Sequence, residues 1–495
     1  MKATLCKLAT LFLVATMLVL AACGPTEAPP APTTAAPATA PTQPVTEPTP
    51  EPTPEVAASA PVTPTLVPGA AKVTVFVGFG TGTDPTQIEL HKQIAQEFNS
   101  THNEIQIEFL TVAYEEHDVK FSTMLAGGMA PDLVMPIGVM GVAAYYDEWL
   151  DVAPYIRRDN YDTGDYYGPA LQLQTYSDKT IGLPIGVYPS VTFYNQDLFD
   201  KAGLDYPPHK FGDPNWTYAG LAEVAKKLTL DTGGNDAASA EFDALNIAQW
   251  GWDGWDWLPF RGAPAKFGGS PLGVSADSKT SELNSPAWLE AAQFIHDSVW
   301  KEHYRPSGEV SSAAFSDIDP LQSGQVAMWE IFSWMAYAYS TWTETFNWDV
   351  AAVPTGPHGN LVAEANGDTF AIPKSSKQPD QAWEVAKWLM EPDIMARLAK
   401  SYGCIPARKS LATGWLAAMN ADNPNVDWQV FLDSIQYMDA QPNHEGWVPN
   451  YTKVWDACEN ALTLLTTEKD TDVPALMQGL NQEVQGYLDE YWATH

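Results

Sequence analysis

The chain has 495 residues, of which 18% are charged, 45% hydrophobic and 12% aromatic. It carries 61 Asp and Glu against 26 Lys and Arg, a formal net charge of −35, which argues against nucleic acid as a partner because phosphates must be neutralised by basic side chains. The hydrophobic and aromatic share excludes a wholly disordered chain. The length predicts two or three domains, and only four cysteines exclude a disulfide-built mini-protein.

Residues 1–22 have the pattern of a secretory signal peptide. Lys2 and Lys7 form a basic start, and residues 8–20 are apolar and uncharged. A membrane span needs about 20 residues, so this run is too short to cross a bilayer, but it fits the core of a signal peptide. It ends in the sequence LAAC, which resembles the bacterial lipobox, and an ordinary small-residue cleavage site is the alternative. We expect Cys23 to be lipidated, so that the lipid anchors the protein on the extracytoplasmic side of the cell membrane.

Residues 24–69 differ in composition from the rest of the chain. They contain 14 Pro and 10 Thr, with no aromatic residue and no Lys or Arg. Such a segment cannot bury apolar surface and favours extended polyproline-like conformations, with a reach of at most about 140 Å at ~3.1 Å per residue. We predict that residues 23–70 comprise the lipidated Cys23 and a disordered spacer.

An alternation of strands and helices begins at residue 71. The β-branched run Ala71–Val77 predicts a buried strand, and apolar residues at helical spacing predict a helix over 85–99. A second strand is expected over 105–112, a helix over 114–127 and a third strand over 133–135. This order predicts an α/β fold with a parallel sheet and helices on both faces.

The turn after the first strand is rich in glycine. Its spacing is Gly78-x-Gly80-x-Gly82, with Thr83 where a dinucleotide-binding fingerprint has its third glycine. We therefore interpret it as a tight turn at the mouth of a cleft, since ligands of open α/β sheets bind at the carboxyl ends of the strands. No cofactor is expected.

Six further stretches occur in a characteristic order. They are AGGMAPD at 126–132, LPIGVYPSVTFYNQDLF at 183–199, WT at 216–217, GQVAM at 324–328, WDVAAVP at 348–354 and AIPKSSK at 371–377. Together they resemble the family 1 extracellular solute-binding proteins, the carbohydrate-type, maltose-binding-protein-like receptors of bacterial ABC importers. The resemblance covers nearly all of residues 71–495.

This resemblance implies a two-lobed, type II periplasmic-binding-protein-like fold with a hinged cleft. The expected crossings between lobes lie near 185–187, 349–351 and Glu391. Lobe 1 would then comprise 71–184 plus 350–390, and lobe 2 would comprise 185–349 plus 391–495. Two lobes facing across a hinge enclose a small ligand only when closed, and the closed form is what a membrane permease can recognise.

Aromatic residues favour a sugar or oligosaccharide as the ligand. Flat rings cover the C–H faces of a sugar, while acids and amides bind its hydroxyls. Tryptophans stand beside acids in two stretches, WGWDGWDW at 250–257 and residues 329–342. We expect the first stretch to form a loop. From these we expect ligand contacts at Trp252, Trp255, Trp329 and Glu330. Core packing is the alternative, because large aromatics are usually buried.

The resemblance also implies individual contacts. Trp334 and Trp455 match two ligand-stacking tryptophans of the maltose receptor, Tyr188 follows the crossover where that receptor has a ligand-binding Glu, and Asp118 matches a ligand-contacting acid. At other positions this sequence lacks the ligand-contacting residues of the maltose receptor, which argues against maltose itself as the ligand. The residues found there are Phe79, Gly80, Thr81, Pro136, Val139 and Met140.

Asn366 and Asp368 lie just before a predicted strand. Their polar side chains would face the cleft, and an exposed loop turn is the alternative.

Other ligands and functions stay open at this stage. A polyamine or quaternary amine would suit aromatic residues and negative charge, and glycerol phosphate could use the glycine-rich turn at a helix N-terminus. A secreted glycosidase would need two carboxylates about 5–10 Å apart. The nine His show no metal-ligand spacing, so no metal is expected. We expect no enzyme activity, a monomer, and ABC permease subunits as partners.

Cys404 and Cys458 are the two thiols that remain once the signal peptide is removed and Cys23 is lipidated. The compartment is oxidising, so we expect them to form a disulfide. Two separate buried thiols are the alternative, because the sequence does not show that the residues are close.

Overall fold

The computed structural model describes residues 69–495, except 177–178, 255–259, 339–341 and 440. The predicted signal peptide, Cys23 and nearly all of the predicted spacer lie outside these residues. Within the described part of the chain, no helix is both long and apolar enough to cross a membrane.

The strands form one large mixed sheet and one small two-stranded sheet. Their bounds are β1 Ala71–Val77, β2 Ile105–Thr111, β3 Leu133–Ile137, β4 Pro184–Asn195, β5 Leu230–Asp231, β6 Ile247–Gln249, β7 Asp253–Gly254, β8 Met328–Phe332, β9 Trp348–Ala351, β10 Ala365–Ala371 and β11 Ile405–Pro406. The order in the large sheet is β2-β1-β3-β10-β4-β8-β7, with β9 and β11 also pairing with β4.

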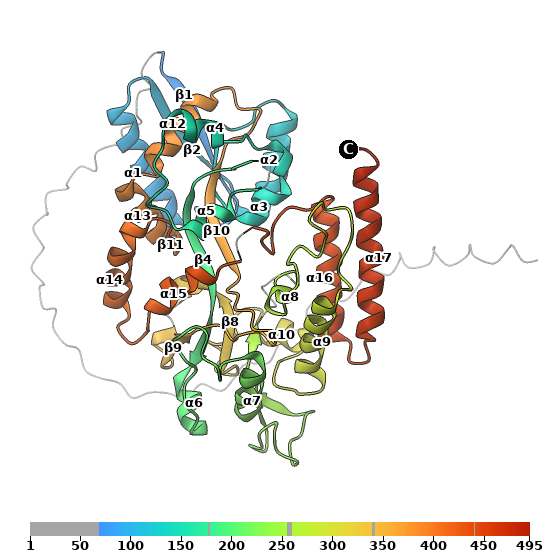
Figure 1. Cartoon of the computed structure of the whole chain (residues 1–495). Coiled ribbons are helices and arrows are strands. Elements are labelled where there is room, and N and C mark those ends of the chain that lie inside the picture. The colour runs from blue at the N-terminus through green and yellow to red at the C-terminus, as the bar shows by residue number, and fades with distance from the viewer. Residues whose placement is uncertain (1–68, 177–178, 255–259, 339–341, 440) are drawn as a thin grey trace, which may run out of the picture. The chain divides into compact units, whose positions relative to one another are not determined.

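Helices surround the sheet, and many of them come from the second half of the chain (Figure 1). They are α1 Pro85–Thr101, α2 His117–Ala126, α3 Val139–Ala144, α4 Ala153–Arg158, α5 Gly168–Leu173, α6 Gln196–Ala202, α7 Tyr218–Leu228, α8 Ala263–Lys266, α9 Pro286–Trp300, α10 Gly308–Ala314, α12 Pro379–Leu389, α13 Pro392–Tyr402, α14 Ala412–Asp422, α15 Gln429–Ser434, α16 Tyr451–Thr467 and α17 Val473–Trp492. Short 3₁₀ turns lie at Tyr114–Glu116, Tyr146–Glu148, Ser333–Ala338, Lys409–Leu411 and Ile435–Tyr437.

The elements predicted at the start of the folded part are confirmed. β1, β2 and β3 match the three predicted strands, and α1 and α2 match the two predicted helices to within a few residues. Local chemistry explains the start of α1: Asp84 accepts the N–H of Thr86, Pro85 is the first helical residue, and Gln87 completes a capping box.

The sheet is parallel only in part. β1 pairs in parallel with β2 and β3, as the strand–helix order predicts, and β7 pairs in parallel with β8. The pairs β10–β3, β10–β4, β4–β8 and β4–β9 are antiparallel. The expected parallel pairing is therefore confirmed for β1, β2 and β3. It does not extend to the rest of the sheet, where β10 enters beside β3 and β4 from a segment far along the chain.

β4 joins two groups of strands. Its first half, 184–189, pairs with β10, and its second half, 190–195, pairs with β8 and β9. All twelve residues of β4 are buried. In the first half, Gly186 also pairs with β11, and a Cβ at this position would lie 2.1 Å from Sγ of Cys404, so only glycine allows this close approach. One continuous strand thus spans both groups.

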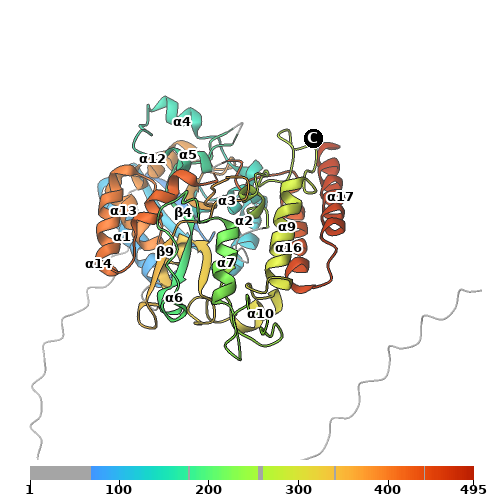
Figure 2. The same ribbon diagram turned by 60° about the horizontal axis from the view of Figure 1, so that its bottom comes forward.

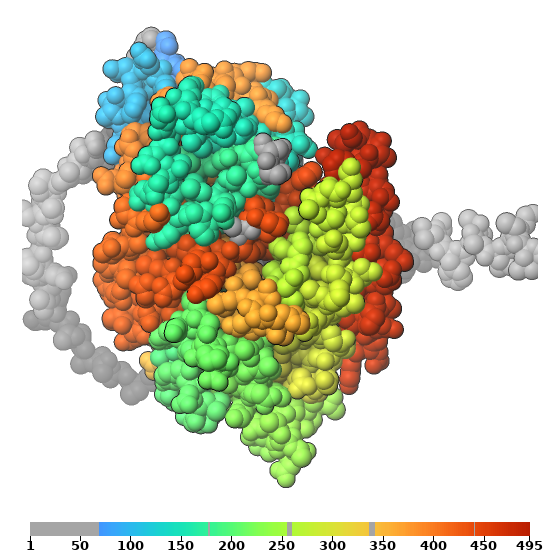
Figure 3. Space-filling view, in the orientation of Figure 1, coloured from blue at the N-terminus to red at the C-terminus, as the bar shows by residue number. Residues whose placement is uncertain are grey.

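The helices also fall into two sets (Figures 1 and 2). α13 packs against α1, α12 and β11, whereas α16 and α17 pack against each other and against α9. In the space-filling view, the dark red surface of the C-terminal helices lies along the yellow-green segment that contains α9 (Figure 3). The stretch after Glu391, assigned to lobe 2 from the sequence, thus begins with a helix that contacts N-terminal elements. The lobe boundaries stay a prediction.

Candidate ligand-binding site

A cavity of about 1520 Å³ lies where the carboxyl end of β1 meets β4 and β10. Its walls come from distant parts of the sequence: the β1–α1 turn, α2 and α3, the end of β8, α13 and α14, and the start of α16. This volume exceeds that of typical small-ligand pockets, roughly 300–1,000 Å³, and accommodates a ligand larger than a single sugar ring.

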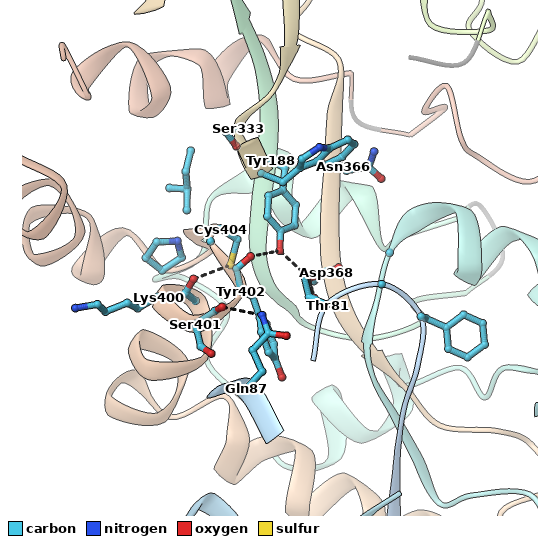
Figure 4. Close-up of a pocket in the computed structure, with 18 of the residues that line it drawn as sticks. Thr81, Gln87, Tyr188, Ser333, Asn366, Asp368, Lys400, Ser401, Tyr402 and Cys404 are labelled. Carbon is cyan, nitrogen blue, oxygen red and sulfur yellow. Dashed lines mark hydrogen bonds between the residues drawn. The ribbon is translucent and has the colours of Figure 1, made fainter. Parts of the chain in front are cut away.

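One buried carboxylate organises a wall of the cavity (Figure 4). Oδ2 of Asp368 accepts hydrogen bonds from the hydroxyl of Tyr188 at 2.9 Å and the hydroxyl of Thr81 at 3.1 Å. Asp368 is only 7% exposed. Burial raises the pKa of its carboxyl to about 6, and the two hydroxyl donors oppose this rise by favouring the ionised form.

The same wall is braced by α1 and α13. The hydroxyl of Tyr188 also lies 3.2 Å from the carbonyl oxygen of Tyr402, and the side-chain amide of Gln87 donates to the carbonyl oxygen of Ser401 at 2.8 Å (Figure 4). Tyr188 and Asn366 are direct partners in the antiparallel pairing of β4 and β10. Asn366 and Asp368, two residues apart, therefore present their side chains on one face of β10.

An aromatic and acidic group lines the part of the cavity near α2 and α3. Oδ1 of Asp118 accepts from the hydroxyl of Tyr145 at 3.0 Å, and Nε2 of His117 lies 3.3 Å from the same oxygen. The ring of Phe79 contacts those of His117 and Tyr145 edge-on, with centroids 4.6 and 5.8 Å apart. Burial raises the pKa of Tyr145 to about 12. The Asp118 carboxyl remains 67% exposed, so it can reach a ligand in the cavity.

Trp334 lies at the end of β8 and is half-buried. Its ring contacts those of Phe332 and Tyr188, with centroids 4.2 and 6.0 Å apart. Trp334 lines the cavity, and so does Trp455 on α16, whose ring lies 5.8 Å from that of Tyr451. These rings offer apolar faces to a ligand without being enclosed in the core.

Six of the residues expected from the sequence line this one cavity. They are Asp118, Tyr188, Trp334, Asn366, Asp368 and Trp455. Whether each contacts a ligand stays a prediction. Sequence reasoning missed Thr81 as a polar contact, and it missed Tyr145, Glu445 and Tyr451. The dipeptide His444-Glu445 matched no binding motif in the sequence, and only the fold brings it beside the β10 residues Asn366 and Asp368.

Three expected contacts lie elsewhere. Trp252, Trp329 and Glu330 are buried to 0%, 2% and 0% exposure and do not line the cavity. Trp329 and Glu330 belong to β8, whose five residues are all buried, and Trp252 packs against Tyr304 and Phe294. The core-packing alternative therefore describes these three. The fourth, Trp255, lies outside the described residues.

The structure corrects the disulfide prediction. Cys404 and Cys458 are both free and buried. Cys404 lies between α13 and β11 against Gly186 and lines the cavity, whereas Cys458 lies within α16 among the residues that face the core. A disulfide would join their Sγ atoms directly, whereas both thiols are free in the structure.

Among the residues that the structure describes, no group of three or more His, Cys, Asp or Glu side chains is arranged to hold a metal ion. The cavity instead offers aromatic rings, hydroxyls, amides and carboxylates. Such a wall binds by stacking and hydrogen bonding.

Comparison with known proteins identifies relatives of this arrangement. The profile of the family described as bacterial extracellular solute-binding protein matches residues 84–396. The maltodextrin-binding protein MdxE of Bacillus subtilis is 23% identical over 372 residues, which cover 74% of this chain and 79% of the relative. The galactooligosaccharide-binding protein of the same organism is 22% identical over 71% of this chain and 76% of its own length.

Solved structures show the same fold. An ABC substrate-binding protein from Listeria monocytogenes in complex with cycloalternan superposes with a TM-score of 0.65 and 21% identity, covering 85% of this chain and 99% of the other. The cyclic alpha-maltosyl-1,6-maltose binding protein from Arthrobacter globiformis has a TM-score of 0.66 and 19% identity, covering 85% and 100%. The predicted α/β, two-lobed type II fold is confirmed.

Proposed function

Since the chain belongs to the bacterial extracellular solute-binding proteins, we propose that it captures a sugar or oligosaccharide outside the cytoplasmic membrane and delivers it to the permease of an ABC importer. The observation that carries this proposal is the cavity itself, where half-buried tryptophans and carboxyl and amide groups line one space. Aromatic faces suit the C–H surface of a sugar ring, and the polar groups suit its hydroxyls. Relatives named for maltodextrin and galactooligosaccharide support the same ligand class.

Ligand capture proceeds by closure of two lobes about β4. The strand changes its pairing partners between Pro189 and Ser190, and Tyr188 lies beside this change and reaches Asp368 in the cavity wall. A ligand that contacts both sides of the cavity favours the closed state by the difference of its affinities for the two states. The lobes proposed are 71–184 plus 350–390 and 185–349 plus 391–495.

The protein is proposed to be held at the extracytoplasmic face of the cell membrane by a lipid on Cys23. In the proposed lipoprotein, this lipid is the anchor and residues 24–69 are the spacer. Cys23→Ala would therefore release the protein from washed membranes into the soluble fraction. Retention of the variant on membranes after a carbonate wash would contradict the lipid anchor.

The sugar-receptor proposal is tested by a thermal-shift screen of mono- and oligosaccharides, followed by calorimetry of those that stabilise the protein. We expect saturable binding with a stoichiometry near one, and no change in the sugar after prolonged incubation. Hydrolysis of the bound oligosaccharide would instead support a secreted glycosidase, and absence of binding across the panel would reject the sugar-receptor proposal.

A further inference from the structure

The cavity wall is rich in acids and poor in basic groups. Five of its residues are acids: Asp84, Asp118, Asp368, Asp422 and Glu445. Within the described lining there is one lysine, Lys400, which is exposed, and there is no arginine. A ligand in this cavity therefore meets many hydrogen-bond acceptors and little positive charge.

Two of these acids are deeply buried, and the nearest positive charge, that of His444, acts on one of them, Glu445, by lowering its pKa. Asp368 and Glu445 are 7% and 8% exposed, and neither forms an ion pair with a Lys, Arg or His of the described chain. Asp368 accepts only from the hydroxyls of Thr81 and Tyr188. Oε2 of Glu445 has no hydrogen-bond partner in the described structure. A buried carboxylate with an unfilled acceptor is unfavourable until a donor reaches it.

A second group points to a ligand at the same end. The hydroxyl of Tyr451, which is 8% exposed and lines the cavity, is also without a partner among the described residues. Glu445 interacts with Asn366, which stands two residues before Asp368 on β10, and the charge of Glu445 raises the pKa of Asp368. Asp368, Asn366, Glu445 and Tyr451 therefore face a common volume.

Three neighbouring cations contact groups other than Asp368, although Nε and Nη1 of Arg261 have no hydrogen-bond partner among the described residues. His444, the residue before Glu445, pairs with Asp439 at 2.6 Å. Lys266 lies between Glu330 and Glu364 at 3.0 and 3.4 Å. Arg261 donates to the carbonyl oxygen of Gly446 and lies 5.8 Å from the centre of the Tyr451 ring, outside the cavity lining.

We propose that the ligand is a saccharide that carries an ammonium group, with this group at the end of the cavity formed by Asp368 and Glu445. This inference rests on the proposed sugar-receptor function and specifies its substrate class. An ammonium has three donors and no acceptor, which matches an acceptor-rich wall, whereas each hydroxyl of a neutral sugar also needs a donor. The rings of Tyr188, Trp334, Tyr451 and Trp455 supply faces for the sugar and for cation–π contact. A uronate or sugar phosphate would add negative charge beside buried carboxylates and is excluded.

Calorimetry with matched sugars tests this assignment. The probes are glucose, glucosamine and glucuronate, the corresponding galactose and mannose series, and the β-1,4-linked dimers of glucose and of glucosamine. At least one amino sugar is expected to bind 10-fold or more tightly than its neutral counterpart, and the acidic sugars are expected not to bind. Neutral sugars binding as tightly as amino sugars would overturn the inference while leaving the sugar-receptor function intact. Absence of any saccharide binding would overturn both.

Isosteric variants locate the preference. Asp368→Asn and Glu445→Gln should each reduce the preference for the amino sugar by roughly 10- to 100-fold, the range for hydrogen bonds to charged groups. Affinity for the neutral counterpart, which also reports correct folding, should change much less. The matched control is Asp422→Asn, because Asp422 lines the same cavity but is exposed. If Asp422→Asn reduced the preference for the amino sugar equally, the preference would come from the overall negative charge of the cavity. That result would overturn the proposed site at Asp368 and Glu445.

Discussion

The hydroxyl of Tyr188 donates a hydrogen bond to Oδ2 of Asp368 over 2.9 Å, and this bond joins β4 to β10 beside the point where β4 changes its pairing partners. The β1–α1 turn adds a second donor, the hydroxyl of Thr81. One carboxylate thus holds together three segments that are far apart in the sequence. A ligand at this carboxylate contacts the strand that connects the two groups of the sheet.

The stability of the unliganded protein should depend on pH through Asp368. Burial raises the pKa of its carboxyl from 3.8 to about 6, so between these pH values the folded state binds more protons than the unfolded state. Stability is therefore lost as the pH rises through about 6. Asp368→Asn removes this effect, and should stabilise the protein at pH 7.5 by about 2 kcal/mol relative to its effect at pH 4.5. Chemical denaturation at both pH values measures the difference, and an equal effect at both would contradict it.

Trp334 and Trp252 should respond oppositely to truncation. Trp334 is half-buried in the cavity wall, so Trp334→Ala should abolish most sugar affinity while lowering the melting temperature of the unliganded protein only slightly. Trp252 is fully buried, and Trp252→Ala should cost about 3–5 kcal/mol of folding free energy. Calorimetry and thermal melts of both variants make the comparison. Severe destabilisation by Trp334→Ala with unchanged affinity would place Trp334 in the core.

Both late cysteines should be free thiols. Alkylation of the denatured, unreduced protein followed by trypsin digestion should give two separately alkylated peptides, 401–408 and 454–469, since Lys and Arg residues flank each cysteine. A cross-linked pair of these peptides, released only by reductant, would show that the disulfide forms. Burial raises the pKa of both thiols, so alkylation of the folded protein should be slow.

Lys266 should be essential for stability. It lies between Glu330 and Glu364, and all three side chains are at most 1% exposed. Lys266→Met would remove the cation that lies between two buried carboxylates and should destabilise the protein by about 3–5 kcal/mol at neutral pH. Adding Glu330→Gln should recover part of this loss, because one of the buried charges is then removed. Urea unfolding of the single and double variants checks both effects, and a neutral Lys266→Met would contradict them.

Local sequence patterns were sufficient for the elements at the start of the fold. β1, α1 and β2 follow from β-branched runs, helical spacing and the capping residues Asp84 and Gln87, all of which act within a few residues. The family resemblance, carried by short motifs in order, predicted the two-lobed fold and four of the six expected residues that share the cavity, while Asn366 and Asp368 were expected from their place before a predicted strand. These features depend on neighbours in the chain or on the order of short motifs along this sequence.

Only the tertiary structure decided which aromatic and acidic residues face the cavity. Trp252 and Trp334 both lie in Trp-rich stretches, yet one packs in the core and the other lines the cavity. Glu445 and Asp368 are 77 positions apart and meet because β10 and the segment before α16 fold against each other. Burial, antiparallel pairing and whether the two cysteines meet all depend on contacts between distant segments, which local periodicity does not encode.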